Sequence, residues 1–323
     1  MIYKRSLQKK FVSGMYTPAV LMVVALALWG CNAFIVAPTG DSGTTFFGPL
    51  SGTYLSSFLT LFFYVVPFFV LRSLDLFENR LRFMPALFML FAVSFPLPND
   101  CVHAFTLLLF MLAVAQIFRA QQCRFAERIL FSSFALLACA SLLQPQALLL
   151  FAPFLAFMFY SNLFSIKHML SAMLGALMPF WFAFGIAYVF PSAKVLLAPF
   201  MTLSGGFFSF VDVEISYMLL LLAAFEALVY IPAIMKFTSS SIPAKPQLRR
   251  RMIFVITMNL YLLVLSALAC QSASLFYLWR LPGLAILCSY VISFKFTKLT
   301  NLYFILLNIV VLAVAIYNLC LIV

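Results

Sequence analysis

The chain has 323 residues, of which 66% are hydrophobic and only 9% are charged. Soluble domains carry about 25% charged residues, so this composition excludes an ordinary soluble protein. The formal net charge of +12 would suit a nucleic-acid ligand, but the Lys and Arg residues lie in short segments between apolar runs, where they orient a membrane protein. We therefore expect an all-α, polytopic transmembrane helical bundle with no nucleic-acid partner.

The basic start of the chain sets the expected orientation. The positive-inside rule places such a segment in the cytoplasm. An apolar helix over residues 16–37, too long for the core of a cleavable signal peptide, then leads outward. A loop over 38–53 without Lys or Arg follows it, and a second helix over 54–71 returns to the cytoplasmic side.

The segment 83–160 reads as four short apolar helices, over 83–96, 102–118, 128–143 and 146–160. Each has roughly 14 to 17 residues, whereas about 20 are needed to cross a hydrocarbon core. The connectors 97–101 and 144–145 contain proline and polar residues and lack Lys and Arg. We expect recessed hairpins that form the floor of a cavity facing away from the cytoplasm.

Helices of ordinary length complete the chain, over 169–190, 216–235, 252–270, 274–294 and 301–323. An outer segment, 191–215, separates the first two of these. The basic, Ser- and Pro-containing stretch 236–251 is interpreted as a flexible cytoplasmic linker between an N-terminal transmembrane module (1–235) and a C-terminal three-helix segment (252–323). In all, about eleven helices are expected, with the N-terminus inside, the C-terminus outside and only Lys194 and Arg280 of the basic residues away from the cytoplasmic side.

Glu226 and Arg280 are the two charges predicted to lie inside apolar helices. A charge within a bilayer is costly, so each should face the bundle interior or a polar cavity and find a partner. One interpretation is that Arg280 binds a phosphate or carboxylate of a substrate through its guanidinium fork. The other is a structural Glu226–Arg280 bridge between the C-terminal helices.

Four further acids and one histidine are candidate site residues. Asp41 follows the first helix on the outer side, where it could act as a catalytic base or anchor a metal, although it also suits a turn. Asp100 and His103 lie at the mouth of the hairpin block and are candidates for substrate binding; Asp100 equally suits a helix N-cap. Asp212 and Glu214 could contribute to a divalent-metal site, or favour the start of the next helix. No cofactor is otherwise indicated.

The middle of the chain resembles an uncharacterised family of polytopic inner-membrane proteins of Bacteroidota (the DUF6427 type). The resemblance covers roughly residues 105–185 and is carried by Gln116-Ile117-Phe118, Glu127 to Phe134, Ala140 to Pro145, Gly175 and Pro179. It implies a multi-pass protein of the bacterial inner (cytoplasmic) membrane with a role in the cell envelope. A second likeness, of architecture only, is to glycosyltransferases of the C superfamily, which use polyprenyl-phosphate sugar donors.

These observations lead to a ranked set of functional hypotheses. The first is a cell-envelope biogenesis protein with a glycosyltransferase-C-like bundle and an outward cavity for a lipid or lipid-linked (polyprenyl-phosphate-type) substrate. Whether it is an enzyme is left open. The alternatives are a non-catalytic subunit of a larger inner-membrane or secretion complex, with other inner-membrane proteins as partners, and a transporter of small molecules or lipids.

Overall fold

The computed structural model describes residues 17–36, 84–94, 101–123, 125–190, 217–239, 246–268, 273–293 and 298–322, with six more positions between 60 and 70. Within these residues the chain forms ten α-helices and one short 3-10 helix, and no strand. The predicted all-α class is therefore confirmed, with ten described α-helices against the expected eleven. The second expected helix, 54–71, lies mostly outside the described residues.

Five of the helices are long and apolar enough to cross a membrane. They are α5 (Cys101–Ala120), α6 (Ala126–Leu143), α8 (Ile166–Val189), α11 (Pro246–Leu268) and the stretch Leu275–Ile292 of α12 (Ala273–Ser293). At 1.5 Å per residue, a helix of 18 residues spans about 27 Å, close to the thickness of a hydrocarbon core. The lengths and apolar composition of these helices are therefore those of membrane-spanning helices.

The prediction that all four helices between 83 and 160 are too short is wrong for two of them. α5 has 20 residues and α6 has 18. Arg119 belongs to the last turn of α5, and Glu127 to the first turn of α6. Charges of these signs are favoured at those ends by the helix dipole, and the helices extend by about two residues beyond the expected bounds 118 and 128. α4 (Met84–Ser94) and the pair formed by η1 (Pro145–Leu150) and α7 (Phe151–Tyr160) are indeed shorter.

The described chain divides into two compact units, each assembled from segments on both sides of the linker expected at 236–251. Unit 1 comprises Met1–Cys101, Asp212–Pro243 and Arg280–Val323; unit 2 comprises Val102–Val211 and Ala244–Trp279. The linker itself is helical at both ends, because Lys236–Ser239 belongs to α10 and Pro246–Arg251 to α11. As a domain boundary, the segment 236–251 stays a prediction.

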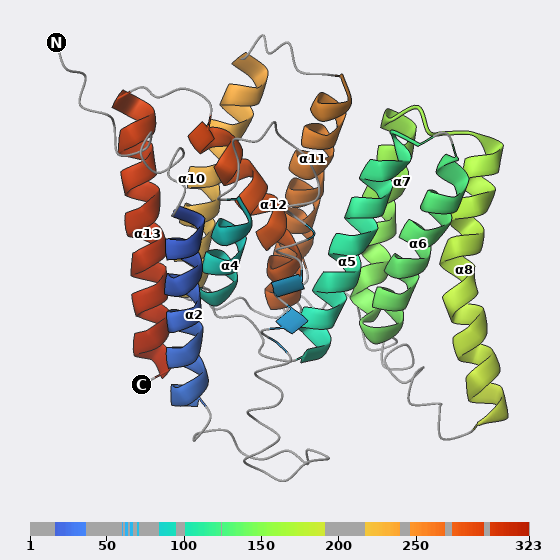
Figure 1. The fold of residues 1–323 in the computed structure, drawn as a ribbon, viewed down its shortest axis with the longest axis horizontal. Helices are drawn as coiled ribbons and strands as arrows, with labels where there is room; N and C mark the ends of the chain where they lie inside the picture. The colour runs from blue at the N-terminus through green and yellow to red at the C-terminus, as the bar shows by residue number, and fades with distance from the viewer. Residues whose placement is uncertain are drawn as a thin grey trace. The chain divides into compact units, whose positions relative to one another are not determined.

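Unit 1 contains α2 (Thr17–Val36), α4, α10 (Tyr217–Ser239), most of α12 and α13 (Lys298–Ile322). α2 and α13, blue and red in Figure 1, pack side by side, and both contact α4. α10 packs against α13. The rings of Phe91 in α4 and Phe225 in α10 meet edge to face at 5.3 Å, and both are fully buried. Glu226, the next residue of α10, is also buried.

Unit 2 is organised around the parallel pair α6 and α8, which lie side by side (Figure 1). The Ser171 hydroxyl donates a 2.6 Å hydrogen bond to the carbonyl of Glu127, a contact across 44 residues. One turn further on, Gly175 lies against the backbone of Phe131, at the same offset. The buried residues of α8 are all small: Ala172, Gly175, Ala183 and Ala187. Small side chains let helix backbones approach closely in a membrane.

Candidate functional site

The two charges expected inside the membrane are brought together in unit 1. Glu226 comes from α10 and Arg280 from α12, and a carboxylate oxygen of Glu226 (Oε2) pairs with a terminal guanidinium nitrogen of Arg280. Both side chains are buried, with exposed fractions of 6% and 2%. Tyr230, one turn after Glu226, is also buried and interacts electrostatically with both charges.

This arrangement favours the structural interpretation of the pair. A buried cation whose fork is turned toward a carboxylate is already neutralised, and removing either charge would leave the other uncompensated. A phosphate ligand would have to displace Glu226 from a buried Arg280 that also interacts with Tyr230. Substrate binding by Arg280 stays a prediction.

Of the other predicted site residues, only His103 belongs to the described part of the chain. Asp41, Asp100, Asp212 and Glu214 lie outside the described residues. His103 lies in the first turn of α5 in unit 2, half-buried, and its carbonyl accepts a hydrogen bond from Thr106. Among the described residues, no cluster of three or more His, Cys, Asp or Glu side chains could hold a metal ion.

A groove of about 410 Å³ runs between α7 and α11 in unit 2. α7 contributes Ala152, Pro153, Ala156, Phe157 and Tyr160. α11 contributes Ile253, Phe254, Thr257 and Tyr261. The small residues on α7 leave space that the side chains of α11 do not fill. The rings of Phe157 and Phe254 lie 4.7 Å apart and are buried, and they form the base of the groove.

The two helices flanking the groove are antiparallel. The Arg250 guanidinium donates to the Ser161 carbonyl (3.1 Å) at one end, and the Tyr261 hydroxyl donates to the Leu149 carbonyl (3.0 Å) at the other. The Thr257 hydroxyl is bonded to carbonyls of its own helix, at 2.9 and 3.1 Å. Because the hydroxyls of Thr257 and Tyr261 are already satisfied, the groove offers mainly hydrocarbon to a ligand.

At one end of this groove, arginines of α11 form hydrogen bonds to neighbouring helices. Arg251 is buried; its Nε donates to the Gln121 side chain (3.3 Å), and its Nη2 donates to the Phe118 carbonyl (2.9 Å) near the end of α5. Gln121 in turn donates to the Ser161 hydroxyl (2.9 Å), just after α7. The start of α11 is therefore bonded to the C-terminal ends of α5 and α7, where cations are favoured by the helix dipole.

The groove and its arginine end were missed in the sequence. We interpreted Arg249-Arg250-Arg251 as loop residues that only orient the chain, yet they occupy the first turns of α11. Pro246 at the helix start was the available signal, because proline is favoured at the first helical position. The groove itself depends on the pairing of α7 with α11, which no local pattern specifies.

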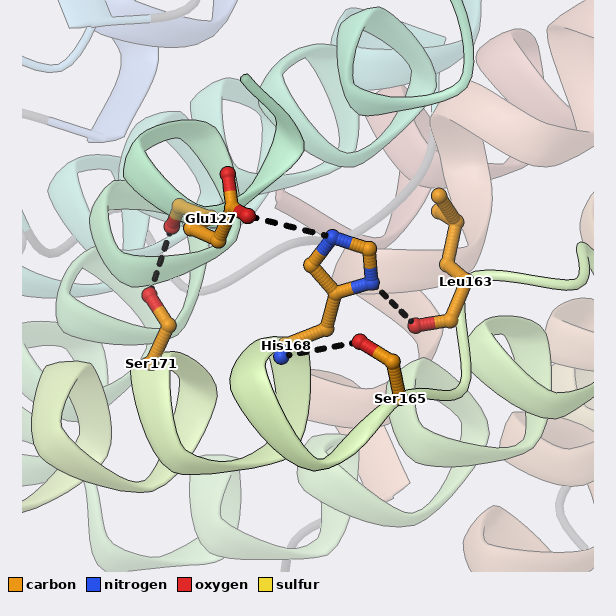
Figure 2. Close-up of polar contacts among 5 residues, drawn as sticks. All are labelled: Glu127, Leu163, Ser165, His168 and Ser171. Carbon is orange, nitrogen blue, oxygen red and sulfur yellow. Dashed lines mark hydrogen bonds and ion pairs between the residues drawn. The ribbon is translucent and has the colours of Figure 1, made fainter. Parts of the chain in front are cut away.

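A second polar cluster joins the starts of α6 and α8 (Figure 2). The His168 imidazole lies between the Glu127 carboxylate, 3.8 Å from Nε2, and the Leu163 carbonyl, 2.9 Å from Nδ1. Ser165 caps α8 by accepting from the His168 backbone N–H at 3.3 Å. The Ser171 hydroxyl is bonded to the Glu127 carbonyl and not to the imidazole. The cluster therefore holds two helix ends together and lacks the serine–histidine contact of a nucleophilic triad.

Comparisons with known proteins add no assignment to this geometry. None of the family models, curated proteins or solved structures compared with the chain matches it. The resemblance to the Bacteroidota inner-membrane family and the architectural likeness to C-superfamily glycosyltransferases stay predictions.

Proposed function

We propose that the chain is a multi-pass protein of the bacterial inner membrane that binds a lipid or lipid-linked substrate during cell-envelope biogenesis, with its N-terminus in the cytoplasm and its C-terminus outside. The observation that supports this proposal is the hydrocarbon-lined groove between α7 and α11. A groove of this composition suits an acyl or isoprenoid chain better than a sugar or a nucleotide, which would need free polar partners.

The dimensions of the groove fit one lipid chain. From Ile253 to Tyr261 the groove follows eight residues of α11, or about 12 Å at 1.5 Å per residue. One leaflet contributes about half of a hydrocarbon core of about 30 Å. In the proposed orientation the arginine end lies at the cytoplasmic surface, so the groove faces the inner leaflet. This differs from the outward cavity expected from the sequence.

Catalysis is not required by this proposal. A catalytic role of Asp41 on the outer side would add a reaction to lipid binding, and Asp41→Asn in the intact protein would test it separately. If Asp41 is catalytic, the substitution abolishes turnover of a polyprenyl-phosphate sugar without changing occupancy of the groove. Unchanged turnover would remove Asp41 from the proposal.

A cross-linking experiment tests lipid binding. The purified protein is placed in vesicles that contain phosphatidylcholine with a photoactivatable acyl chain, and cross-linked peptides are identified by mass spectrometry. We expect cross-links to concentrate on α7 and α11. Ala156→Leu fills the groove and should reduce them severalfold, because a leucine side chain occupies the space of the lipid chain.

The matched control is Gly185→Leu. Gly185 lies on α8 with nothing within 4 Å of an added Cβ, so the substitution adds similar bulk on an open surface. It should leave the cross-links on α7 and α11 unchanged. Equal labelling of α7, α11 and the exposed face of α8 would mean that the groove holds only surrounding lipid, and the proposal would fail.

One observation on α8 bears on the alternative of a non-catalytic subunit in a larger complex. The large apolar side chains of this helix point away from the rest of unit 2; Trp181 is 80% exposed and Tyr188 is 91% exposed. Surrounding lipid would cover these residues equally well. Trp181→Ala and Tyr188→Ala would reduce co-purification of inner-membrane partners if the alternative is correct, and would change nothing if lipid alone covers α8.

A further inference from the structure

We infer that the arginine end of the α7–α11 groove binds the phosphate of an anionic glycerophospholipid whose acyl chain lies in the groove. This inference rests on the proposed function, because it supplies the headgroup for the lipid chain proposed there. It is carried by three observations: the place of Arg250, the hydrogen bond that holds it, and the charge of unit 2.

Arg250 lies at the mouth of the groove. It precedes the lining residues Ile253 and Thr257 on α11 by three and seven positions, which are positions on one face of a helix. Its hydrogen-bond partner Ser161 directly follows Tyr160, the last lining residue of α7. Both helices therefore place the guanidinium where the groove ends.

The hydrogen bond to Ser161 holds the Arg250 side chain without neutralising it. One terminal nitrogen donates to a backbone carbonyl, which carries no full charge. The guanidinium has five N–H donors in a planar fork that suits two phosphate oxygens at once. Arg249, the preceding residue, is exposed and adds a second positive charge at the same helix end.

Unit 2 has almost no carboxylates to balance its basic residues. Its sequence contains a single acid, Glu127, against nine basic residues: Arg119, Arg124, Arg128, Lys167, Lys194, Lys245, Arg249, Arg250 and Arg251. Glu127 is engaged with His168 (Figure 2). No carboxylate of unit 2 is therefore left to pair with Arg249 or Arg250, and at a membrane surface the phosphate of an anionic lipid can provide the counter-charge.

A purely structural role for Arg250 is the competing explanation. A cation at the end of α7 stabilises that helix through its dipole, with or without a lipid. Arg250→Gln separates the two roles, because it removes the charge that would bind a phosphate but keeps an N–H donor on the side chain. Lys167→Gln is the matched control: it removes one positive charge from an exposed residue at the start of α8, outside the groove.

The test is native mass spectrometry of the intact protein in detergent, titrated with phosphatidylglycerol and with phosphatidylcholine of the same acyl chains. We expect phosphatidylglycerol to bind more tightly, by about fivefold for each arginine involved. Arg250→Gln should lower that preference about fivefold without weakening phosphatidylcholine. Lys167→Gln should change neither, and Ala156→Leu should weaken both lipids alike.

The outcomes separate this inference from the proposed function. If Ala156→Leu weakens both lipids while Arg250→Gln leaves the ratio of their affinities unchanged, the headgroup assignment is wrong and the groove proposal stands. If Ala156→Leu affects neither lipid, the groove proposal is wrong and the headgroup assignment fails with it. Tighter binding of a polyprenyl phosphate than of phosphatidylglycerol would overturn the choice of a glycerophospholipid.

Discussion

Replacing Gly175 by alanine should separate α8 from α6. A Cβ at this position would overlap the carbonyl oxygen of Phe131 and lie 3.0 Å from the carbonyl carbon and Cα of the same residue. These are backbone atoms in the middle of α6, so no side-chain rotation can remove the overlap. The helices must move apart, by roughly 1 Å, to restore ordinary van der Waals contact.

The cost follows from what holds the two helices together. In a membrane, close packing of small residues replaces the hydrophobic effect as a source of helix association. A gap of 0.5–1 Å forfeits about a quarter to a half of the dispersion attraction at each affected contact. Overpacking of this kind costs about 1–3 kcal/mol. Alanine returns about 1 kcal/mol through its helix propensity, which leaves a net loss of about 0–2 kcal/mol.

Gly185→Ala on the same helix is the control. An added Cβ meets nothing within 4 Å there, so we expect no loss and a gain of up to about 1 kcal/mol from helix propensity. Unfolding of both variants by sodium dodecyl sulfate, followed by circular dichroism in mixed micelles, gives the two free energies. The packing argument is refuted if Gly175→Ala and Gly185→Ala have the same free energy of unfolding within about 0.3 kcal/mol.

The remaining predictions concern polar contacts and use the same assay. Glu226→Gln and Arg280→Gln should each destabilise unit 1 by about 3–5 kcal/mol, because each leaves a buried charge unpaired; a double-mutant cycle should give a coupling above about 0.5 kcal/mol, and strict additivity would contradict the pair. Glu127→Gln should cost at most about 1 kcal/mol, because its 3.8 Å contact with His168 is partly exposed; a larger loss would contradict this. Tyr261→Phe should cost about 0.5–1.5 kcal/mol through the lost bond to Leu149, and an unchanged stability would mean that this bond is not formed.

The all-helical, membrane-type fold could be predicted because it follows from local composition. Helix ends were harder: Arg119 and Glu127 looked like loop residues, although their charges suit the helix ends at which they lie. The sequence indicated that Glu226 and Arg280 each need a partner, since an isolated charge in an apolar helix is costly. This need can be inferred from each residue and its own helix, without knowing which helices pack together.

The groove could not be predicted in this way. It exists because Ala152 and Ala156 face Ile253 and Thr257, and that pairing depends on the relative position of α7 and α11. The same limit applies to Arg250 and Arg251, whose acceptors are backbone carbonyls at Ser161 and Phe118. Every residue type has a backbone carbonyl, so the sequence does not indicate which residue accepts the hydrogen bond.

The parallel course of α6 and α8 has an electrostatic consequence at the end where both begin. Each helix N-terminus carries about half an elementary positive charge, so two adjacent N-termini repel each other and together attract an anion. Glu127 lies in the first turn of α6 and contacts His168 in the first turn of α8 (Figure 2). Its carboxylate thus acts as a shared counter-ion for two helices that would otherwise resist starting side by side.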